Sequence, residues 1–298
     1  MKPIKFPEVK NDYIQQLKKR LINDQDILML LKELNMTEEV VLKNAVIFAD
    51  WLKVQKYCKE CSGLEMCNRS NPGYRMKIDE NLEQLLVPCE YLKAKESLIS
   101  HKENYLLCDL SDKNLTLSLD EIDLSEESDY YKGIVNIARQ WVKELPKKGL
   151  YFYGGLGTGK TYLASAICND LARKGHEVAF VNYPKLCSDI RSNLTEYDYV
   201  DSRVRRLRRA KILVIDDIGA ESVTNYIRDD ILFPILDYRM EHELKTIFTS
   251  NCDLKSLEKR MTISKSGEED AIKALRIIER IRTLCDAVSV TGPSRRRL

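Results

Sequence analysis

Short apolar runs alternate with longer amphipathic segments through the second half of the chain. The runs at 149–153, 178–182, 211–216, 245–250 and 287–290 have the length and composition of buried strands. The segments between them place apolar residues at helical spacing, so strand and helix succeed each other. Such alternation predicts an α/β fold, in which a parallel sheet carries helices on both faces.

The first part of the chain predicts helices instead. Residues 12–34 have apolar side chains at helical spacing, with a break near 23–24. Thr37 is placed to cap a following helix that continues to Leu52. We therefore expect a small, mainly helical domain over residues 1–108.

Between these regions the composition shifts toward Asp, Glu and Ser. Residues 109–129 have only isolated apolar side chains, with one short strand expected at 115–117. A helix is predicted over 131–145, ending at Pro146. We expect the segment 109–129 to be an acidic linker and residues 130–298 to form the second domain.

A phosphate-binding loop follows the first strand of that second domain. Residues 154–161 read Gly-Gly-Leu-Gly-Thr-Gly-Lys-Thr and satisfy the pattern G-x-x-x-x-G-K-[ST]. Glycines let successive N–H groups point into one concavity that holds phosphate oxygens, and the next helix adds the positive end of its dipole. Lys160 would reach the β- and γ-phosphates, and the Thr161 hydroxyl would take one position on Mg²⁺. The nucleotide-binding residues expected here are Gly154, Gly155, Leu156, Gly157, Thr158, Gly159, Lys160, Thr161 and Tyr162.

Polar residues follow two further buried runs. Asp216 and Asp217 come directly after the apolar residues 212–215, at the sheet edge where ligands bind in open α/β folds. Asp216 is placed to hold Mg²⁺, directly or through water, and Asp217 to polarise the attacking water. Asn251, after the strand at 245–250, could hydrogen-bond that water or the γ-phosphate. Together with the phosphate loop, these residues predict a nucleotide hydrolase.

Composition limits the setting of the protein. The chain has 298 residues, enough for two domains, and its net charge of +2 indicates no particular class of partner. It contains no run of 18 apolar residues and no apolar signal core near its N-terminus. We therefore expect a cytoplasmic protein without a membrane span.

Nine cysteines are many for such a setting, because intracellular chains rarely form disulfides. Cys58, Cys61 and Cys67 stand close together, and a C-x-x-C pair lets two thiolates meet one tetrahedral ion. Soft ligands favour zinc, which would add folding energy to a small domain; a reduced, metal-free cluster is the alternative. Candidates for the fourth ligand, in order of preference, are Cys89, His101 and Cys108. The scattered cysteines are expected to be buried free thiols, namely Cys108, Cys168, Cys187, Cys252 and Cys285.

Two basic segments could contact other molecules. Arginines and a lysine crowd residues 203–211, which fits either a solvated helix face or contact with nucleic acid. The basic tail at 294–297 follows the last strand and could fold back over the nucleotide.

These motifs together resemble the AAA+ ATPases, and within them the helicase-loader branch that includes bacterial DnaC, DnaI and the transposition helper IstB. The sequences at 216–221, 228–230 and 235–240 look especially like DnaI-type primosomal loaders, and those at 276–282 and 292–296 fit as well. The cysteine-bearing N-terminal region is similar as well, so the resemblance covers essentially the whole chain.

The resemblance implies roles for further residues. Arg280 would be the arginine finger that enters a neighbour's site, with Arg276 and Arg282 as neighbouring candidates. A finger supplied in trans stabilises charge on the transferring phosphoryl group, so hydrolysis would depend on assembly. Asn251 would be the first sensor and Arg295 the second, reaching the γ-phosphate. The catalytic set is then Lys160, Asp216, Asp217, Asn251 and Arg280.

The function implied is ATP-dependent loading of the replicative hexameric DNA helicase. The N-terminal domain would grip the helicase, and the C-terminal domain would use ATP and single-stranded DNA to control opening and release of the ring. Other primosome proteins and further copies of this chain are expected partners, and ATP, Mg²⁺ and Zn²⁺ expected cofactors. An IstB-like transposition helper and a nucleotide-gated adaptor with negligible hydrolysis are the alternatives.

Two features depart from the pattern of the superfamily. Asp217 stands where most AAA+ proteins carry Glu, and the shorter acid suggests slow turnover. The residues after 291 leave no room for the helical lid common in the superfamily.

Overall fold

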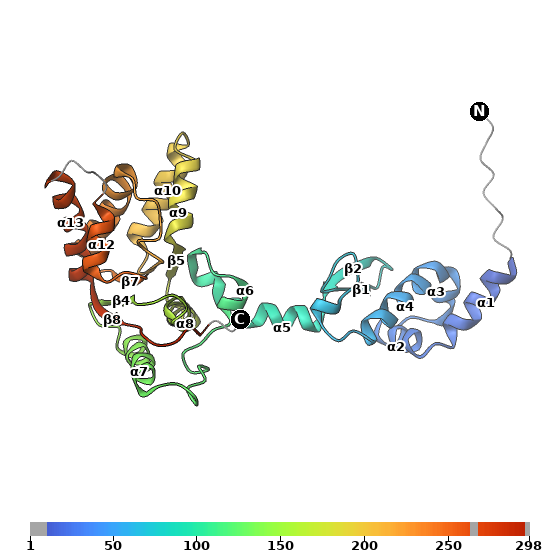
Figure 1. The fold of residues 1–298 in the computed structure, drawn as a ribbon. Helices are drawn as coiled ribbons and strands as arrows, with labels where there is room; N and C mark the ends of the chain where they lie inside the picture. The colour runs from blue at the N-terminus through green and yellow to red at the C-terminus, as the bar shows by residue number, and fades with distance from the viewer. Residues whose placement is uncertain (1–10, 263–267, 296–298) are drawn as a thin grey trace. The chain divides into compact units, whose positions relative to one another are not determined.

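The structure, a computed structural model, describes residues 11–262 and 268–295. Its contacts divide the chain into two compact units, Met1–Ser97 and Leu98–Leu298, each with an apolar core of its own (Figure 1). Within the described residues, no helix combines the length and apolar character that a membrane span requires.

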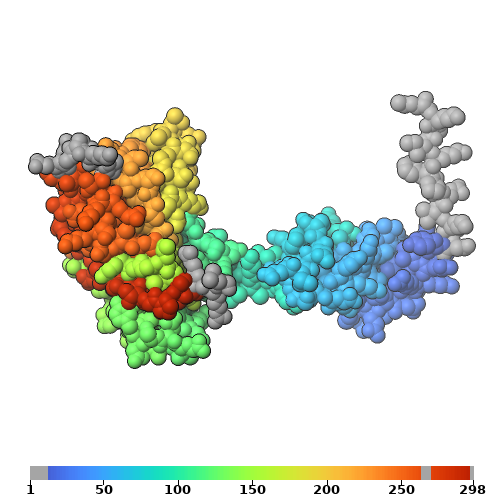
Figure 2. All heavy atoms as spheres, viewed as in Figure 1, coloured from blue at the N-terminus to red at the C-terminus, as the bar shows by residue number. Residues whose placement is uncertain are grey.

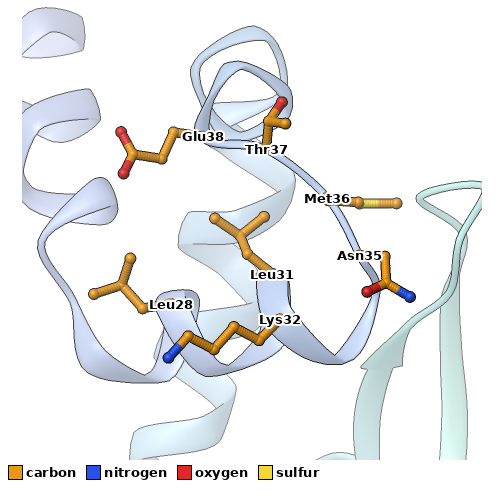
Figure 3. A pocket seen from close by; sticks show the side chains of 7 residues that line it. All are labelled: Leu28, Leu31, Lys32, Asn35, Met36, Thr37 and Glu38. Carbon is orange, nitrogen blue, oxygen red and sulfur yellow. The ribbon is translucent and has the colours of Figure 1, made fainter.

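The first unit is mainly helical, with one antiparallel pair of strands after the helices. Its helices are α1 (Asn11–Ile22), α2 (Gln25–Glu33), α3 (Glu38–Lys43), α4 (Ala45–Lys59) and the 3₁₀ turn η1 (Leu64–Met66), and its strands are β1 (Tyr74–Ile78) and β2 (Gln84–Pro88). The predicted break near 23–24 is present because the Asp24 carboxylate accepts a hydrogen bond from the Asp26 N–H and caps α2. The predicted second helix is interrupted at Asn44. A pocket between α2 and α3 is lined by Leu28, Leu31, Lys32, Asn35, Met36, Thr37 and Glu38 (Figure 3).

The second unit is built on a parallel sheet with the strand order β3-β5-β6-β7-β4-β8. The strands are β3 (Tyr105–Cys108), β4 (Gly149–Tyr153), β5 (Val178–Asn182), β6 (Ile212–Asp216), β7 (Lys245–Ser250) and β8 (Cys285–Ser289). The predicted α/β fold is therefore confirmed, and the five predicted strands are present, three of them with the predicted bounds.

Helices cover both faces of this sheet, and the sheet separates two layers of apolar core. The helical segments of this unit are η2 (Ser100–Asn104), α6 (Asp112–Leu115), α7 (Asp129–Glu144), α8 (Lys160–Arg173), α9 (Tyr183–Ser192), α10 (Tyr197–Arg209), the π-helix η3 (Tyr226–Leu232), α11 (Phe233–Glu241), α12 (Leu254–Met261) and α13 (Glu268–Leu284), whereas α5 (Glu90–Leu98) belongs to the first unit up to Ser97. One layer buries residues of α7 and α8, and the other buries residues of α9, α11 and α13. Both faces of the sheet are thus buried from solvent, as its continuous apolar strands require.

The segment expected to be a linker differs from the prediction. Residues 105–108 form an edge strand of the sheet, and α6 replaces the short strand expected at 115–117. Leu110, Leu115 and Leu119 are buried in the same core layer as α7 and α8. Because the division between units falls after Ser97, the segment packs as part of the second unit and the boundary lies before residue 108.

Candidate nucleotide-binding site

A cavity of about 710 Å³ lies where β4, β6 and β7 end at the carboxyl edge of the sheet. Parallel strands present their following loops at one edge, so residues far apart in sequence meet there. The cavity is lined by Asn114, Ile122, Asp123, Glu127, Tyr131, Leu156, Gly157, Gly159, Lys160, Thr161, Tyr162, Asn182, Asp216, Asp217, Asn251 and Arg295.

The predicted phosphate loop connects β4 to α8. Gly157 and Gly159 have φ values of 76° and 97°, a region that glycine adopts without strain. A Cβ at Gly154 would collide with the Val290 carbonyl of the neighbouring edge segment, so this position also requires glycine. The buried Lys160 ammonium donates to the carbonyls of Gly154 and Gly155, at 3.0 and 2.7 Å. The loop therefore has the curled shape that phosphate binding needs.

Three polar side chains lie within hydrogen-bond distance of the Asp216 carboxylate. Thr161 Oγ1 and Thr249 Oγ1 donate to Asp216 Oδ1 at 2.8 and 2.7 Å, and Asn182 Nδ2 lies 3.4 Å from Oδ2. Burial raises the pKa of the Asp216 carboxyl, and these hydrogen bonds oppose that rise. A carboxylate and a hydroxyl that already converge are hard oxygen ligands of the kind Mg²⁺ prefers, so the residues fit that ion.

Asp217 points to a different partner although it is adjacent in sequence. Its backbone is in the left-handed region, with φ at 59°, and its N–H donates to Thr249 Oγ1 at 2.8 Å. Asn251 Nδ2 donates to Asp217 Oδ1 at 3.0 Å. The second acid and the predicted sensor amide are therefore brought together in the same cavity.

Arg295 also lines the cavity, but its guanidinium is already engaged. It donates to the Glu127 carboxylate and to the Thr158 carbonyl, and it lies over the Tyr131 ring. In Figure 2 the segment after β8, in dark red, lies on the surface beside the green phosphate-loop region, in agreement with the hydrogen bond between Arg295 N–H and the Gly157 carbonyl.

Comparison with known proteins places this site in a family. The sequence profile of the family described as "IstB-like ATP binding protein" matches residues 90–298. This chain belongs to that family. As a member it is a P-loop ATPase, and membership implies ATP and Mg²⁺ as ligands of the cavity.

Individual relatives of this IstB-like protein extend the comparison. The replicative helicase loader DnaI of Bacillus subtilis is 28% identical over 290 residues, covering 95% of this chain and 93% of that protein. The loader DnaC of Escherichia coli is 29% identical over 125 residues, 41% of this chain and 51% of its own length. A crystal structure of DnaI aligns with a TM-score of 0.56 and 35% identity, covering 66% of this chain and all but 1% of that one. The predicted relationship to DnaI-type loaders is confirmed.

The predicted arginine finger of this IstB-like protein lies outside its own cavity. Arg280, on α13, donates to Asp237 Oδ1 through Nε and Nη2, at 3.1 and 2.9 Å. Arg276 and Arg280 both lie over the Phe233 ring, and Arg282 pairs with Glu279. None of the three arginines lines the cavity of the same chain.

The predicted zinc ligands are not gathered into a metal site in the structure. Among the described residues, no group of three or more His, Cys, Asp or Glu side chains could hold a metal ion. Cys61 Sγ instead donates to the Gly63 carbonyl, and Cys58 Sγ accepts from Arg69. The alternative ligand His101 is buried in the second unit, 3.3 Å from Asn169 Oδ1. Zinc is thus not supported by the arrangement of these side chains.

Of the residues that the structure describes, the remaining cysteines and the two basic segments lie outside the nucleotide cavity, apart from Arg295. Cys168, Cys187, Cys252 and Cys285 are buried free thiols, as predicted, whereas Cys108 is half-buried. The basic segment 203–211 lies mostly on α10, where Arg205 pairs with Asp201. Of the basic tail, Arg296 and Arg297 lie outside the described residues.

Sequence reasoning missed several residues of the site. Asn182 ends a strand that was predicted, so its place at the carboxyl edge was a usable signal. Thr249 lies within a predicted strand and points to Asp216. Glu127 and Tyr131 fell in the expected linker and the helix after it, and nothing local marks them.

Proposed function

We propose that this protein is an ATP-dependent loader of the replicative hexameric DNA helicase. The observation that carries the proposal is the similarity to DnaI over nearly the whole of both chains, including the N-terminal unit that lies mostly outside the IstB-like match. A cavity lined by Lys160, Thr161, Asp216, Asp217 and Asn251 supports an ATP-driven function of this kind.

The residues of the cavity take the following proposed roles. Lys160 and the loop N–H groups bind the phosphates, and Thr161 and Asp216 hold Mg²⁺. Bound Mg·ATP supplies the phosphoryl group that water attacks. Asp217 accepts a hydrogen bond from that water and polarises it, and Asn251 orients Asp217 through the contact at 3.0 Å.

In this proposal the two units bind different partners. The first unit grips the helicase, and the second binds ATP and single-stranded DNA, for which the exposed arginines of α10 offer phosphate contacts. Copies of the chain assemble on the helicase, where Arg280 of one copy acts on the ATP of the next. Other primosome proteins are further partners. Zinc is not part of this proposal, because the side chains of Cys58, Cys61, Cys67 and Cys89 do not form a metal site in the described residues. Metal analysis of the purified protein checks this, and one zinc per chain, lost in Cys61→Ser, would overturn it.

Helicase loading on circular single-stranded DNA tests the function. The full-length protein should bind the hexameric helicase of its organism and stimulate unwinding of an annealed oligonucleotide in the presence of ATP. Lys160→Ala should still bind the helicase but not stimulate unwinding, because it removes the phosphate-binding ammonium. Lys174→Ala, at the exposed end of the same helix, is the matched control and should behave as wild type. Absence of both helicase binding and stimulation would refute the proposal.

A transposition helper remains the second candidate, because the matching family profile is named after IstB. Such a protein would assemble on duplex DNA in an ATP-dependent way. Electron microscopy with duplex DNA and ATP separates the two: filaments formed without any affinity for the helicase would favour the helper.

A further inference from the structure

Three groups hold Arg295 in place beside the phosphate loop. Arg295 Nε and Nη2 donate to Glu127 Oε1 and Oε2, both at 2.6 Å, and Nη1 donates to the Thr158 carbonyl at 2.8 Å. The guanidinium carbon lies 3.6 Å from the centroid of the Tyr131 ring. A two-point ion pair of this kind fixes both the position and the plane of the guanidinium.

Arg295 contacts the loop through the loop's carbonyl groups. In a phosphate loop the N–H groups converge on the ligand, so the carbonyls point away from it. Arg295 uses those carbonyls: its side chain bonds to Thr158, and its own N–H donates to the Gly157 carbonyl at 2.8 Å. Glu127, Arg295 and Tyr131, here called the clamp, therefore hold the loop through carbonyls that a phosphate does not use, although all three side chains also line the cavity.

The segment after β8 and the Tyr131 side chain leave no space for a side chain at Gly157 or Gly159. A Cβ at Gly157 would collide with Ser294 Oγ, and one at Gly159 would lie 2.9 Å from the Tyr131 hydroxyl oxygen. The glycines thus let α7 and the segment after β8 pack directly against the loop backbone. Backbone held in this way loses less freedom when phosphate binds.

The electrostatics agree with a clamp. Glu127 forms an ion pair with Arg295, and hydrogen bonds from Arg295 hold the pKa of the Glu127 carboxyl below its usual range. A cation so paired, with its donors aimed at Glu127 and Thr158, is poorly suited to recognise a γ-phosphate.

We infer that Glu127 is a positioning residue for nucleotide binding, which acts through Arg295 to hold the carbonyl groups of the phosphate loop and so serves ATP and ADP alike. This inference rests on the proposed ATP site and replaces the expected role of Arg295 as a sensor of the γ-phosphate. It also gives a role in nucleotide binding to the segment 109–129, which the sequence predicted to be a linker.

Nucleotide affinity measured on the full chain tests the inference. Glu127→Gln keeps the size of the side chain but loses the charge, and the dissociation constants for ATP and ADP should both rise by about tenfold, since a charge-assisted hydrogen bond is lost. The ratio of the two constants should stay within about twofold of wild type. Glu126→Gln changes the exposed neighbouring acid and is the matched control, with both constants unchanged.

Steady-state hydrolysis adds a readout that general destabilisation would not reproduce. Because Asp216 and Asp217 are untouched, Glu127→Gln should raise KM with kcat within about twofold, the signature of lost uniform binding. Arg295→Met is the second variant, which also serves if Glu127→Gln does not fold. It should weaken ATP and ADP equally. The double variant should lose no more than Arg295→Met alone, because Arg295→Met already lacks the contact that Glu127→Gln removes.

The outcomes separate this inference from the proposed function. Equal affinities for wild type and Glu127→Gln would overturn the clamp while leaving the ATP site intact. A selective loss of ATP over ADP in Arg295→Met would overturn it in favour of a γ-phosphate sensor. Failure of the wild-type protein to bind either nucleotide would instead refute the ATP site itself.

Discussion

At the scale of single residues, the adjacent acids Asp216 and Asp217 are separated by backbone conformation. Asp216 ends β6 in extended backbone and faces two hydroxyls, whereas Asp217 enters the left-handed region and faces an amide. That region costs a residue other than glycine about 1–2 kcal/mol, which the hydrogen bonds from Asn251 and to Thr249 offset. The strain places the second acid where water can reach it.

Asp217→Asn tests the role of that second acid. Asparagine tolerates the left-handed region, so the backbone should keep its shape and ATP affinity should stay within about twofold. Single-turnover hydrolysis should fall by about 10²–10⁴-fold, because the amide cannot polarise the attacking water. Asp230→Asn, on the exposed side of η3, is the control. A hydrolysis rate equal to wild type would exclude the proposed role of Asp217.

At the scale of elements, the sequence predicted the strands that depend on local composition and missed the packing between segments that are far apart in the chain. β4, β6 and β7 were predicted because their continuous apolar runs depend only on burial within the sheet. The acidic segment was not, because its isolated leucines become a core only when they meet α7 and α8. The clamp could not be predicted for the same reason, since Glu127 and Arg295 are 168 residues apart.

Asn169 on α8 is the residue that fastens the acidic segment to the phosphate-loop helix. Its buried side chain donates to the carbonyls of Asn114 and Leu117, at 2.7 and 2.9 Å, and accepts from the Tyr105 hydroxyl. Asn169→Leu should lower the free energy of unfolding of the second unit by about 2–4 kcal/mol, because the Tyr105 hydroxyl loses this acceptor, the Asn114 carbonyl loses its side-chain donor and the Leu117 carbonyl keeps only Arg173 of its two side-chain donors. Urea titration measures the change, and Lys174→Ala should alter it by less than about 0.5 kcal/mol. A loss as small as the control's would show that the segment is held elsewhere.

At the scale of the whole molecule, the proposed arginine finger Arg280 does not line the cavity of its own chain. Arg280 is kept on α13 by Asp237 and Phe233, outside the cavity. If the finger acts in trans, each hydrolysis site consists of the ATP-binding residues of one copy and the arginine of a neighbouring copy.

Mixing two inactive variants tests that division. Lys160→Ala lacks the phosphate-binding ammonium but keeps its finger, and Arg280→Ala binds ATP but lacks the finger. Each should be nearly inactive alone, and the mixture should recover a substantial part of the turnover measured with helicase and single-stranded DNA. A mixture as inactive as its components, under conditions where wild type turns over, would place the finger elsewhere.

The clamp on the phosphate loop also bears on the order in which the protein is made. Thr158 leaves the ribosome 137 residues before Arg295, the residue that fastens its carbonyl. A growing chain therefore carries the glycine loop without its support, and ATP capture becomes a property of the finished polypeptide. Stalled chains that end before Val290 should bind ATP more weakly than released ones, which would keep incomplete copies from engaging a partner in the ATP-bound form.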